Sequence, residues 1–373
     1  MNKSDYSNSI TNLSNSILNH FGVEPFHNTI PRIDKALEGK KKVIVFLFDA
    51  LGKVILEKHL KEKSFFRSHI IHNMSSTTPP TTVASTTSFL SGKYPIENGW
   101  LGWCLYFSEL DKCVNVFTNM DDLTGEPVSE HNVMREKCPY KDIAQLINEK
   151  NGKDIAQTIF GYPVDKQTKE VRKLNSFVKY AFDSLKEKDE GFTYAYWPSP
   201  DNLMHMYGTN SFRVHLNIKK IERTIKKYSK KNPDTAVLVI ADHGMIDVTW
   251  ENISKHEDLT SLLVKPMTIE KRCANFYVQK GKESEFKAIF NKYYKDYYIL
   301  LTKDEAIEQK IFGDAEPSKN ALNFMGDFIG LATSNLTLEW PKETKKKHVP
   351  FKGHHAGNSL DELEISIIGL NLK

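Results

Sequence analysis

The sequence lacks any long apolar segment. No apolar run approaches the roughly 18 to 20 residues that cross a bilayer, and the first thirty residues have no apolar core of the signal-peptide kind. Cysteine is scarce as well: the chain has four cysteines, and none forms a C-x-x-C pair. We therefore predict a cytoplasmic protein without a membrane span, whose cysteines are reduced thiols to which we assign no chemistry.

The sequence also lacks a strong charge of either sign. Its 373 residues contain 51 Lys and Arg against 47 Asp and Glu, which gives a formal net charge of +4. The lysines are grouped in short runs, "EGKKK", "KKYSKK" and "ETKKKH", which acidic residues separate. Such runs are typical of solvated surface, with a nucleic-acid groove as the alternative. We expect no stable nucleic-acid complex.

Apolar runs and amphipathic stretches alternate along the chain. The runs "KVIVFLFDA", "GFTYAYWPSPD" and "AVLVIADHG" are continuous, and helical periodicity follows in "SFVKYAFDSLKEK" and "SFRVHLNIKKIERTIKKYSKK". Continuous apolar strands between amphipathic helices indicate a mostly parallel sheet that is covered on both faces. The sequence therefore predicts an α/β protein built as a three-layer α/β/α sandwich.

The pattern changes after "ADHG", where a compact segment reads as strand, helix, strand and helix before the main sheet resumes. We predict an inserted α+β cap at 261–319, within a catalytic α/β domain that covers 41–260 and 320–373. The polar stretch 1–40 is predicted to be a helical or partly disordered arm.

Three apolar runs end on acidic side chains. Asp49 closes "VIVFLFDALG", and Asp201 follows "YAYWPSP". Asp242 and His243 together follow "VLVIA". A single polar pair at the end of a strand is most simply a turn where the chain leaves the core. In open parallel sheets, however, ligands bind beyond the carboxyl ends of the strands. Three acidic strand ends in one chain therefore predict one shared crevice.

Histidines accompany these carboxylates. His205 follows Asp201 by four residues in "PDNLMHMYG", so a helix that starts after Pro200 places both on one face, with a surface ion pair as the alternative. His354 and His355 lie in the Gly-rich segment "FKGHHAGNSLDEL", where an exposed loop is the alternative. Carboxylate and imidazole ligands without cysteine suit two divalent ions, and we predict Zn²⁺ with Mn²⁺ as the alternative.

A dinuclear site commonly activates a nucleophile, and "SSTTPPTTVASTTSFLSGKYP" offers a hydroxyl. Pro79 and Pro80 favour an extended approach, a helix would begin at Thr81 and Thr82, and Gly92 would end it. At the start of a helix, backbone N–H groups favour phosphate, and a coordinated hydroxyl can ionise. Simple N-capping is the alternative.

The segments "FLFDALG", "PPTTVASTTSFLSGKYP", "PDNLMH", "ADHGM" and "GHHAGNS", in this order, resemble the alkaline phosphatase superfamily and specifically its type I phosphodiesterase / nucleotide pyrophosphatase branch. The resemblance extends from about Val43 to the C-terminus, with the cap matching in position only. It implies a metal-dependent hydrolase of phosphodiester or pyrophosphate bonds, with a small phosphodiester or nucleotide as substrate. The family's nucleophile falls on Thr82, and attack on phosphorus would give a phosphothreonine intermediate that is then hydrolysed.

The resemblance also assigns the metal ligands. It gives one ion to Asp49, Asp242 and His243, bridged towards Thr82, and the other ion to Asp201, His205 and His355. His355 is preferred because the family's late ligand directly precedes a small-residue/Gly pair, here Ala356 and Gly357. Since Ala356 departs from the usual glycine, His354 stays open as the alternative.

Charge favours a diester substrate. Two divalent ions and three carboxylates leave about one positive charge, which suits the single negative charge of a phosphodiester, and no Arg falls within the motifs. A phosphomonoesterase or phosphonate hydrolase on the same ions, or a non-catalytic nucleotide-binding module, are the alternatives. In "ENGWLGWCLYFSEL", Trp103 and Tyr106 are candidates for stacking on a nucleobase, with a core role as the alternative.

Overall fold

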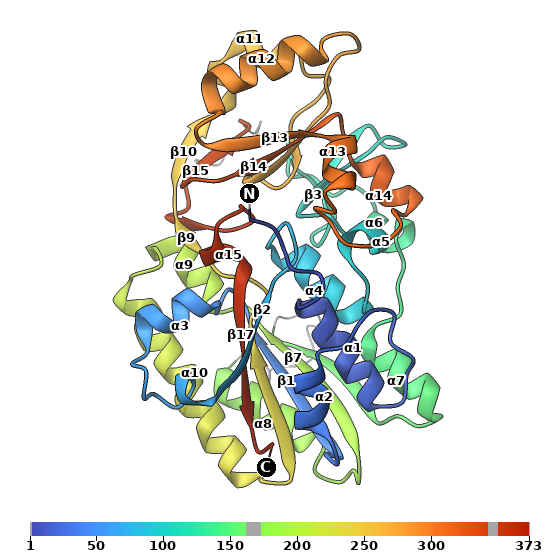
Figure 1. The fold of residues 1–373 in the computed structure, drawn as a ribbon, viewed down its shortest axis with the longest axis vertical. Helices are drawn as coiled ribbons and strands as arrows, with labels where there is room; N and C mark the ends of the chain where they lie inside the picture. Colours follow the sequence, from blue (N-terminus) through green and yellow to red (C-terminus); the bar gives the residue numbers. More distant parts are fainter. Residues whose placement is uncertain (1, 162–172, 342–349, 373) are drawn as a thin grey trace.

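The computed structural model describes residues 2–161, 173–341 and 350–372. The basic run "ETKKKH" at 343–348 lies outside the described residues. Figure 1 shows an elongated molecule in which the main sheet occupies one end and a second sheet the other. No helix in the described ranges is long and apolar enough to cross a membrane. The cytoplasmic location stays a prediction.

The main sheet has six strands. Four neighbouring strands, β8, β1, β7 and the edge strand β6, run parallel to one another. The strands β17 and β2 complete the other edge in antiparallel pairings. In sheet order the strands are β2 (Ile70–Ser75), β17 (Glu364–Leu370), β8 (Thr235–Ile240), β1 (Lys42–Phe48), β7 (Gly191–Trp197) and β6 (Ala156–Phe160). Strands β8 and β1 are buried almost throughout, as expected for parallel strands that are covered on both faces.

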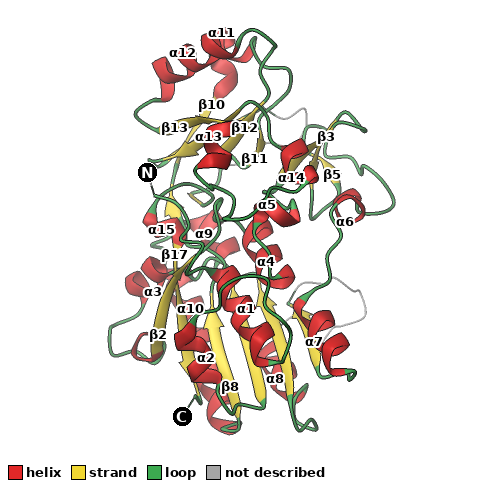
Figure 2. Ribbon diagram, turned by 45° about the vertical axis from the view of Figure 1, so that its right-hand side comes forward, coloured by secondary structure: helices red, strands yellow, loops and turns green. Residues whose placement is uncertain are grey.

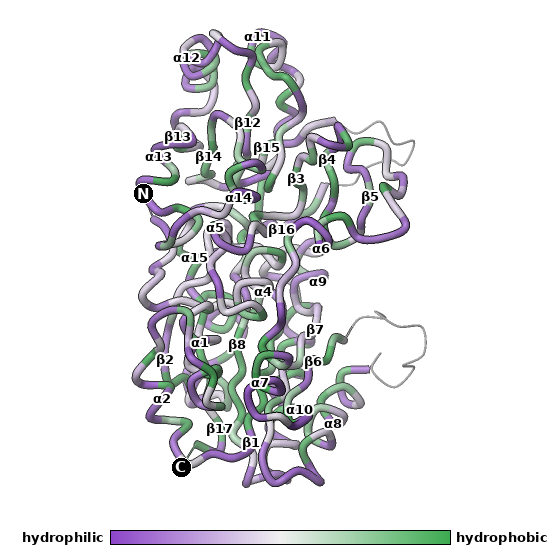
Figure 3. Tube along the Cα trace, turned by 90° about the vertical axis from the view of Figure 1, so that its right-hand side faces the viewer, coloured by the Kyte–Doolittle hydropathy of each residue, from purple (hydrophilic) through white to green (hydrophobic). Residues whose placement is uncertain are grey.

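Helices cover both faces of this sheet. On one face α1 (Ile10–His20) packs against α4 (Thr82–Ser91) and α7 (Ile143–Asn151), and α2 (Pro31–Leu37) packs on α1. On the other face α10 (Phe212–Lys231) packs against α8 (Leu174–Asp183) and α9 (Asp201–Tyr207). Figure 3 shows α1 on one side of the hydrophobic strands and α8 and α10 on the other. The predicted three-layer α/β/α sandwich is confirmed.

The second sheet has seven short antiparallel strands. In order they are β13 (Tyr298–Thr302), β14 (Phe328–Ala332), β12 (Cys273–Phe276), β11 (Thr268–Ile269), β3 (Cys104–Phe107), β4 (Lys112–Asn115) and β5 (Met120–Asp121). The helices α11 (Glu257–Thr260), α12 (Glu283–Tyr294), α13 (Lys303–Glu308) and α14 (Lys319–Phe324) accompany it (Figure 2). Because β3 to β5 and β14 come from outside 261–319, this sheet gathers more of the chain than the predicted cap. The domain limits themselves stay a prediction.

Candidate functional site

Three neighbouring strands of the main sheet deliver acidic side chains to one place. Strand β1 lies between β8 and β7, and Asp49 directly follows β1. Asp242 follows β8 by two residues, while Asp201 begins α9 shortly after β7. The backbone N–H of Asp201 donates to the carbonyl of Asp49 at 3.1 Å, which fixes these two strand ends to each other. The carboxyl ends of parallel strands thus bring the three carboxylates together.

Asp49, Asp242 and His243 form one group, close to Thr82. The His243 Nε2 atom lies 3.3 Å from Asp49 Oδ1 and 3.6 Å from Asp242 Oδ2. The Thr82 hydroxyl lies 3.3 Å from the same Nε2 and 3.5 Å from Asp49 Oδ2. The side chains of Asp242 and His243 are fully buried, whereas Thr82 is half-buried. Their geometry would suit a metal ion, as carboxylate and imidazole atoms converge.

A second group surrounds Asp201. His205 Nε2 lies 3.3 Å from Asp201 Oδ2, and His355 Nε2 lies 3.8 Å from Asp201 Oδ1. The ring of His355 also stacks on that of His243, with centroids 3.9 Å apart. Asp201, His243 and His355 therefore form a second convergent triad. We refer to Asp49, Asp201, His205, Asp242, His243 and His355 together as the Asp/His cluster.

The histidines of the cluster are held in one tautomer by backbone carbonyls. The Nδ1 atom of His205 lies 2.8 Å from the carbonyl of Gly353, and that of His243 lies 2.8 Å from the carbonyl of Gly244. The Nδ1 atom of His355 lies 3.1 Å from the carbonyl of Pro80. Because only an N–H can donate to a carbonyl, Nδ1 carries the proton and Nε2 faces the carboxylates. This arrangement is the usual second contact of metal-binding histidines.

His354 is placed differently, on the short strand β16 (Gly353–His354), which pairs with β9 (Ile246–Asp247). Its Nδ1 atom accepts the backbone N–H of His355 at 2.8 Å, so that nitrogen is already engaged. Its ring lies against Trp250, with centroids 5.4 Å apart. Within the described part of the chain, no carboxylate lies within ion-pair distance of His354. The geometry favours His355 over His354 as the late histidine of the cluster.

The buried carboxylates retain oxygens without a hydrogen bond, which is the strongest indication of a cation. Asp49 Oδ1, Asp201 Oδ1 and Asp242 Oδ2 are buried and accept no hydrogen bond. The other Asp242 oxygen, Oδ1, accepts hydrogen bonds from the backbone N–H groups of Ala50 at 3.0 Å and His243 at 3.1 Å. These two bonds hold the carboxylate in place and so determine where its Oδ2 atom lies. Unpaired buried carboxylate oxygens are costly, and divalent ions would satisfy them. The residues present therefore fit a metal centre.

The pKa values of the cluster reflect how closely its buried carboxylates lie to one another. Burial raises the pKa of Asp242 to about 8, and the nearby Asp49 charge adds to this. Burial and Asp201 likewise raise the pKa of Asp49. Burial alone would lower the pKa of His243, but Asp242 and Asp49 outweigh it and raise it to about 10. Burial and the crowding of negative charge thus disfavour ionised Asp49 and Asp242 unless a positive charge lies beside them.

The start of α4 is open to an anion. Thr81 is the N-cap residue, yet its side chain makes no capping hydrogen bond. Its hydroxyl instead donates to Glu270 Oε1 at 2.6 Å, and the same oxygen accepts the backbone N–H of Trp103 at 2.9 Å. The first-turn N–H groups of α4 therefore remain for a ligand beside the Thr82 hydroxyl. The simple N-capping alternative is not what the structure has.

Glu270 and Tyr196 are two residues at this site that no sequence pattern predicts. The Tyr196 hydroxyl donates to Asp49 Oδ2. Glu270 is buried, and it joins the second sheet to the start of α4 through Thr81 and Trp103. Burial raises the pKa of Glu270 to about 7. Neither residue lies in a recognisable motif, since each reaches the site only through tertiary contacts.

The Glu270→Gln substitution tests this burial. A carboxyl whose pKa rises from 4.5 to about 7 on folding binds its proton more tightly in the folded state, so stability falls as pH rises through this window. Glutamine keeps an acceptor for Thr81 and Trp103 and cannot ionise. In metal-free protein, urea titrations should show the variant gaining about 3 kcal/mol over wild type between pH 4 and pH 8. The Glu285→Gln substitution at an exposed position is the control and should show no such gain. If the stability of Glu270→Gln changed with pH in the same way as that of wild type, the raised pKa of Glu270 would be contradicted.

The loop after the late histidine is held by a buried ion pair. Arg272 donates from Nε to Glu362 Oε1 at 2.8 Å, and both side chains are fully buried. Glu362 Oε1 also accepts the backbone N–H of Gly357 at 2.8 Å. A Cβ at Gly357 would lie 2.6 Å from Arg272 Nη2, so glycine is required for this close approach. The pair thereby fixes the loop that carries His355.

Ala356 adopts a left-handed backbone, with φ of 81°, where glycine is unstrained. Ala356→Gly should therefore raise the free energy of unfolding by about 1 kcal/mol, measured by urea denaturation. The helical Ala144→Gly in α7 is the control and should lower it by about 1 kcal/mol. If Ala356→Gly lowered the free energy of unfolding as much as Ala144→Gly, the backbone at Ala356 would not be strained.

The aromatic residues after α4 divide into two kinds. Trp100 and Phe107 are each 1% exposed and belong to the core of the second sheet. Trp103 is 39% exposed, and its ring contacts Phe117. Tyr106 donates its hydroxyl to Asp111, and the Lys265 ammonium lies over its ring. Substrate contacts by Trp103 and Tyr106 stay predictions.

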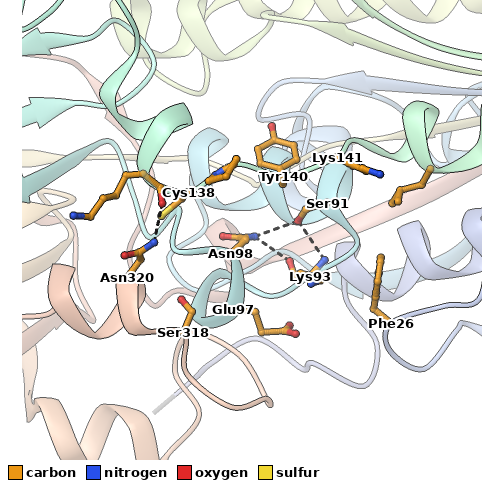
Figure 4. A pocket seen from close by; sticks show the side chains of 13 residues that line it. Phe26, Ser91, Lys93, Glu97, Asn98, Cys138, Tyr140, Lys141, Ser318 and Asn320 are labelled. Atoms are coloured by element: carbon orange, nitrogen blue, oxygen red, sulfur yellow. Dashed lines mark hydrogen bonds between the residues drawn. The ribbon is translucent and has the colours of Figure 1, made fainter. Parts of the chain in front are cut away.

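A hollow of about 390 Å³ lies at the other end of α4 and is separate from the Asp/His cluster (Figure 4). It is bordered by Ser91, Asn98, Tyr140 and Asn320, among others. With a rise of ~1.5 Å per residue, Ser91 lies roughly 13 Å along α4 from Thr82. The Asn98 amide donates to the Lys93 carbonyl at 3.1 Å, within this hollow and away from the start of α4.

Residues 43–357 match the type I phosphodiesterase / nucleotide pyrophosphatase family. Comparison with curated proteins found no match. Among solved structures, an inactive variant of murine ectonucleotide pyrophosphatase / phosphodiesterase 5 in complex with AMP is similar, with 14% identity, 88% of each chain covered and a TM-score of 0.64. Phosphonoacetate hydrolase from Sinorhizobium meliloti in complex with phosphonoacetate is also similar, with 15% identity, coverage of 88% of this chain and 90% of that chain, and a TM-score of 0.66.

Proposed function

Because the chain belongs to the type I phosphodiesterase / nucleotide pyrophosphatase family of the alkaline phosphatase superfamily, we propose that it hydrolyses phosphodiester or pyrophosphate bonds of small molecules such as nucleotides, with Thr82 as the nucleophile. The observation that supports this best is the position of Thr82. Its hydroxyl lies within 3.5 Å of Asp49 and His243, at a helix start whose N–H groups are left open. A phosphate held there would have its phosphorus next to the hydroxyl.

The Asp/His cluster would hold two divalent ions, which we propose are Zn²⁺, with Mn²⁺ as the alternative. Asp49, Asp242 and His243 would hold one ion, and Asp201, His205 and His355 the other. When bound, the ions supply positive charge that stabilises the attacking and the leaving oxygen. The unpaired carboxylate oxygens and the fixed histidine tautomers support this assignment.

The chain's own residues perform the remaining work. The Thr82 oxygen forms a bond to phosphorus as its proton passes to solvent, and the bond from phosphorus to the leaving oxygen breaks. Water then cleaves the phosphothreonine ester and restores the Thr82 hydroxyl. Backbone N–H groups of the first turn of α4 orient the non-bridging phosphate oxygens. Tyr196 and the backbone N–H groups on Asp242 keep the carboxylates in place.

Phosphonate hydrolysis is a second candidate. The fold is shared with phosphonoacetate hydrolase at the TM-score given above. Attack by Thr82 on a phosphonate phosphorus would break a P–C bond in place of a P–O bond, and the departing carbon would take a proton from water. The charge balance still favours a diester, because two ions against three carboxylates leave about one positive charge for a monoanion.

The test is hydrolysis of bis(nitrophenyl) phosphate, nitrophenyl phosphate and phosphonoacetate by metal-reconstituted protein. We expect the diester to be the best substrate, with its hydrolysis lost in Thr82→Ala. A preference for the monoester would indicate a phosphatase, and release of phosphate from phosphonoacetate alone would establish the second candidate. Nucleotide binding without turnover of any of the three would leave a non-catalytic binding module.

A further inference from the structure

The outward face of α10 carries positive charge along its whole length. The helix turns Val214, Ile218, Ile221 and Ile225 inward, where they are buried in the main core. Its exposed positions include seven cationic residues: Arg213, Lys220, Arg223, Lys226, Lys227, Lys230 and Lys231. The one acidic residue of the helix, Glu222, is buried and accepts the backbone N–H of Phe66. No acidic side chain of α10 therefore interrupts this face.

The cations are aligned rather than scattered. Arg213, Lys220, Arg223, Lys227 and Lys230 recur at intervals of three, four and seven residues, which places them on one side of a helix. Twenty residues give a helix of about 30 Å, so the row spans the flank of the molecule. Figure 1 shows α10 on that flank, beside the main sheet. Among the residues that the structure describes, none of the seven cations forms an ion pair.

Exposed apolar side chains lie at the start of the same helix. Phe212 is 71% exposed and Leu216 is 53% exposed, and Leu216 lies between Arg213 and Lys220 in the cationic row. Met206, which is 58% exposed, comes from α9, a helix that packs against α10. Solvated lysine runs need no such neighbours, and grouped exposed apolar residues typically mark an interaction site. We call the seven cations with Met206, Phe212 and Leu216 the α10 face.

We propose that the α10 face docks the protein on a bilayer that contains anionic lipids. The cations would meet the headgroups, while Phe212, Leu216 and Met206 would enter the boundary with the acyl chains. A nucleic acid would also attract the cations, but its backbone gives no role to Leu216 and Met206, so the lipid surface accounts for more of the face. This docking needs neither the metal ions nor turnover.

The test is co-sedimentation of the whole chain with vesicles of phosphatidylcholine, with and without about 30% phosphatidylserine, at about 0.1 M salt. Wild type should bind the anionic vesicles preferentially. Arg223→Gln/Lys227→Gln/Lys230→Gln should weaken that binding about 100-fold, since each cation contributes about 1 kcal/mol near such a surface. Phe212→Ser/Leu216→Ser should weaken it at least about 10-fold through lost apolar burial. Hydrolysis of a soluble diester should be unchanged in both variants.

The matched control is Lys280→Gln/Lys287→Gln/Lys295→Gln, which removes three exposed cations around α12. It should bind as wild type does. Equal binding of neutral and anionic vesicles, an equal loss in the control, or no effect of Phe212→Ser/Leu216→Ser would overturn the proposal. So would tight binding of a short RNA duplex through the same cations by a protein that ignores vesicles. These outcomes are independent of whether the chain proves to be a diesterase.

Discussion

Thr82→Ala should lower the rate of phosphodiester hydrolysis by about 10⁴-fold or more while the protein stays folded and keeps its metal. The reason is that the Thr82 oxygen would form the bond to phosphorus. The Tyr196 hydroxyl also contacts Asp49, but among the described residues only the Thr82 hydroxyl lies within hydrogen-bond distance of both Asp49 and His243. Thr82→Ser should retain part of the activity. Steady-state rates and metal content, measured on the same preparations, check this result.

The matched control is Thr87→Ala in the same helix. Thr87 follows Thr82 by five residues and is therefore turned about 140° from it around α4. This variant should keep wild-type turnover apart from a small stability effect. Comparable losses at positions 82 and 87 would mean that damage to α4, and not loss of a nucleophile, explains the effect.

Removal of the metal ions should have an effect of similar size. Chelation should bring hydrolysis to the background rate, and Zn²⁺ or Mn²⁺ should restore it, because the ions would supply the positive charge that stabilises the attacking and leaving oxygens. The three buried carboxylates, each with an oxygen that accepts no hydrogen bond, are the groups that would hold them. Asp242→Asn should lose at least about 10³-fold and bind less metal. Metal content by atomic emission and the diesterase rate are the measurements.

Thermal stability gives a second readout of the same centre. An ion at about 1,000 times its dissociation constant stabilises the folded state by about 4 kcal/mol, so reconstituted wild type should melt higher than the chelated protein. Asp242→Asn should show a smaller rise. The exposed Asp183→Asn is the control and should behave as wild type in activity and in melting. Full activity after chelation, with no metal detected, would contradict a metal-dependent site.

Much of the fold was predictable because it rests on long, regular patterns. The continuous apolar runs became β1, β7 and β8, and the stretch from Thr82 to Gly92 became α4 with its glycine end in a left-handed conformation. The second sheet was not predictable in the same way. Its strands are two to five residues long, and β3 pairs with β11 from more than 160 residues later, so no local periodicity marks them.

The candidate site also has a part that local sequence patterns predict and a part that only the folded structure shows. Its carboxylates and His243 directly follow predicted strands, and a parallel sheet brings such ends together whatever the loops do. Tyr196 and Glu270 contribute through contacts that only the folded chain creates. The choice between His354 and His355 also depended on which backbone groups each ring meets, and adjacent residues in a sequence carry no such information.

The proposed covalent intermediate on Thr82 is tested most directly by mass spectrometry of acid-quenched protein during turnover of a nitrophenyl diester. We predict a mass increase equal to the retained phosphoryl ester, located on the peptide that contains Thr82 and absent from Thr82→Ala. Turnover by wild type with no adduct under quench, or an adduct on another residue that persists in Thr82→Ala, would contradict it.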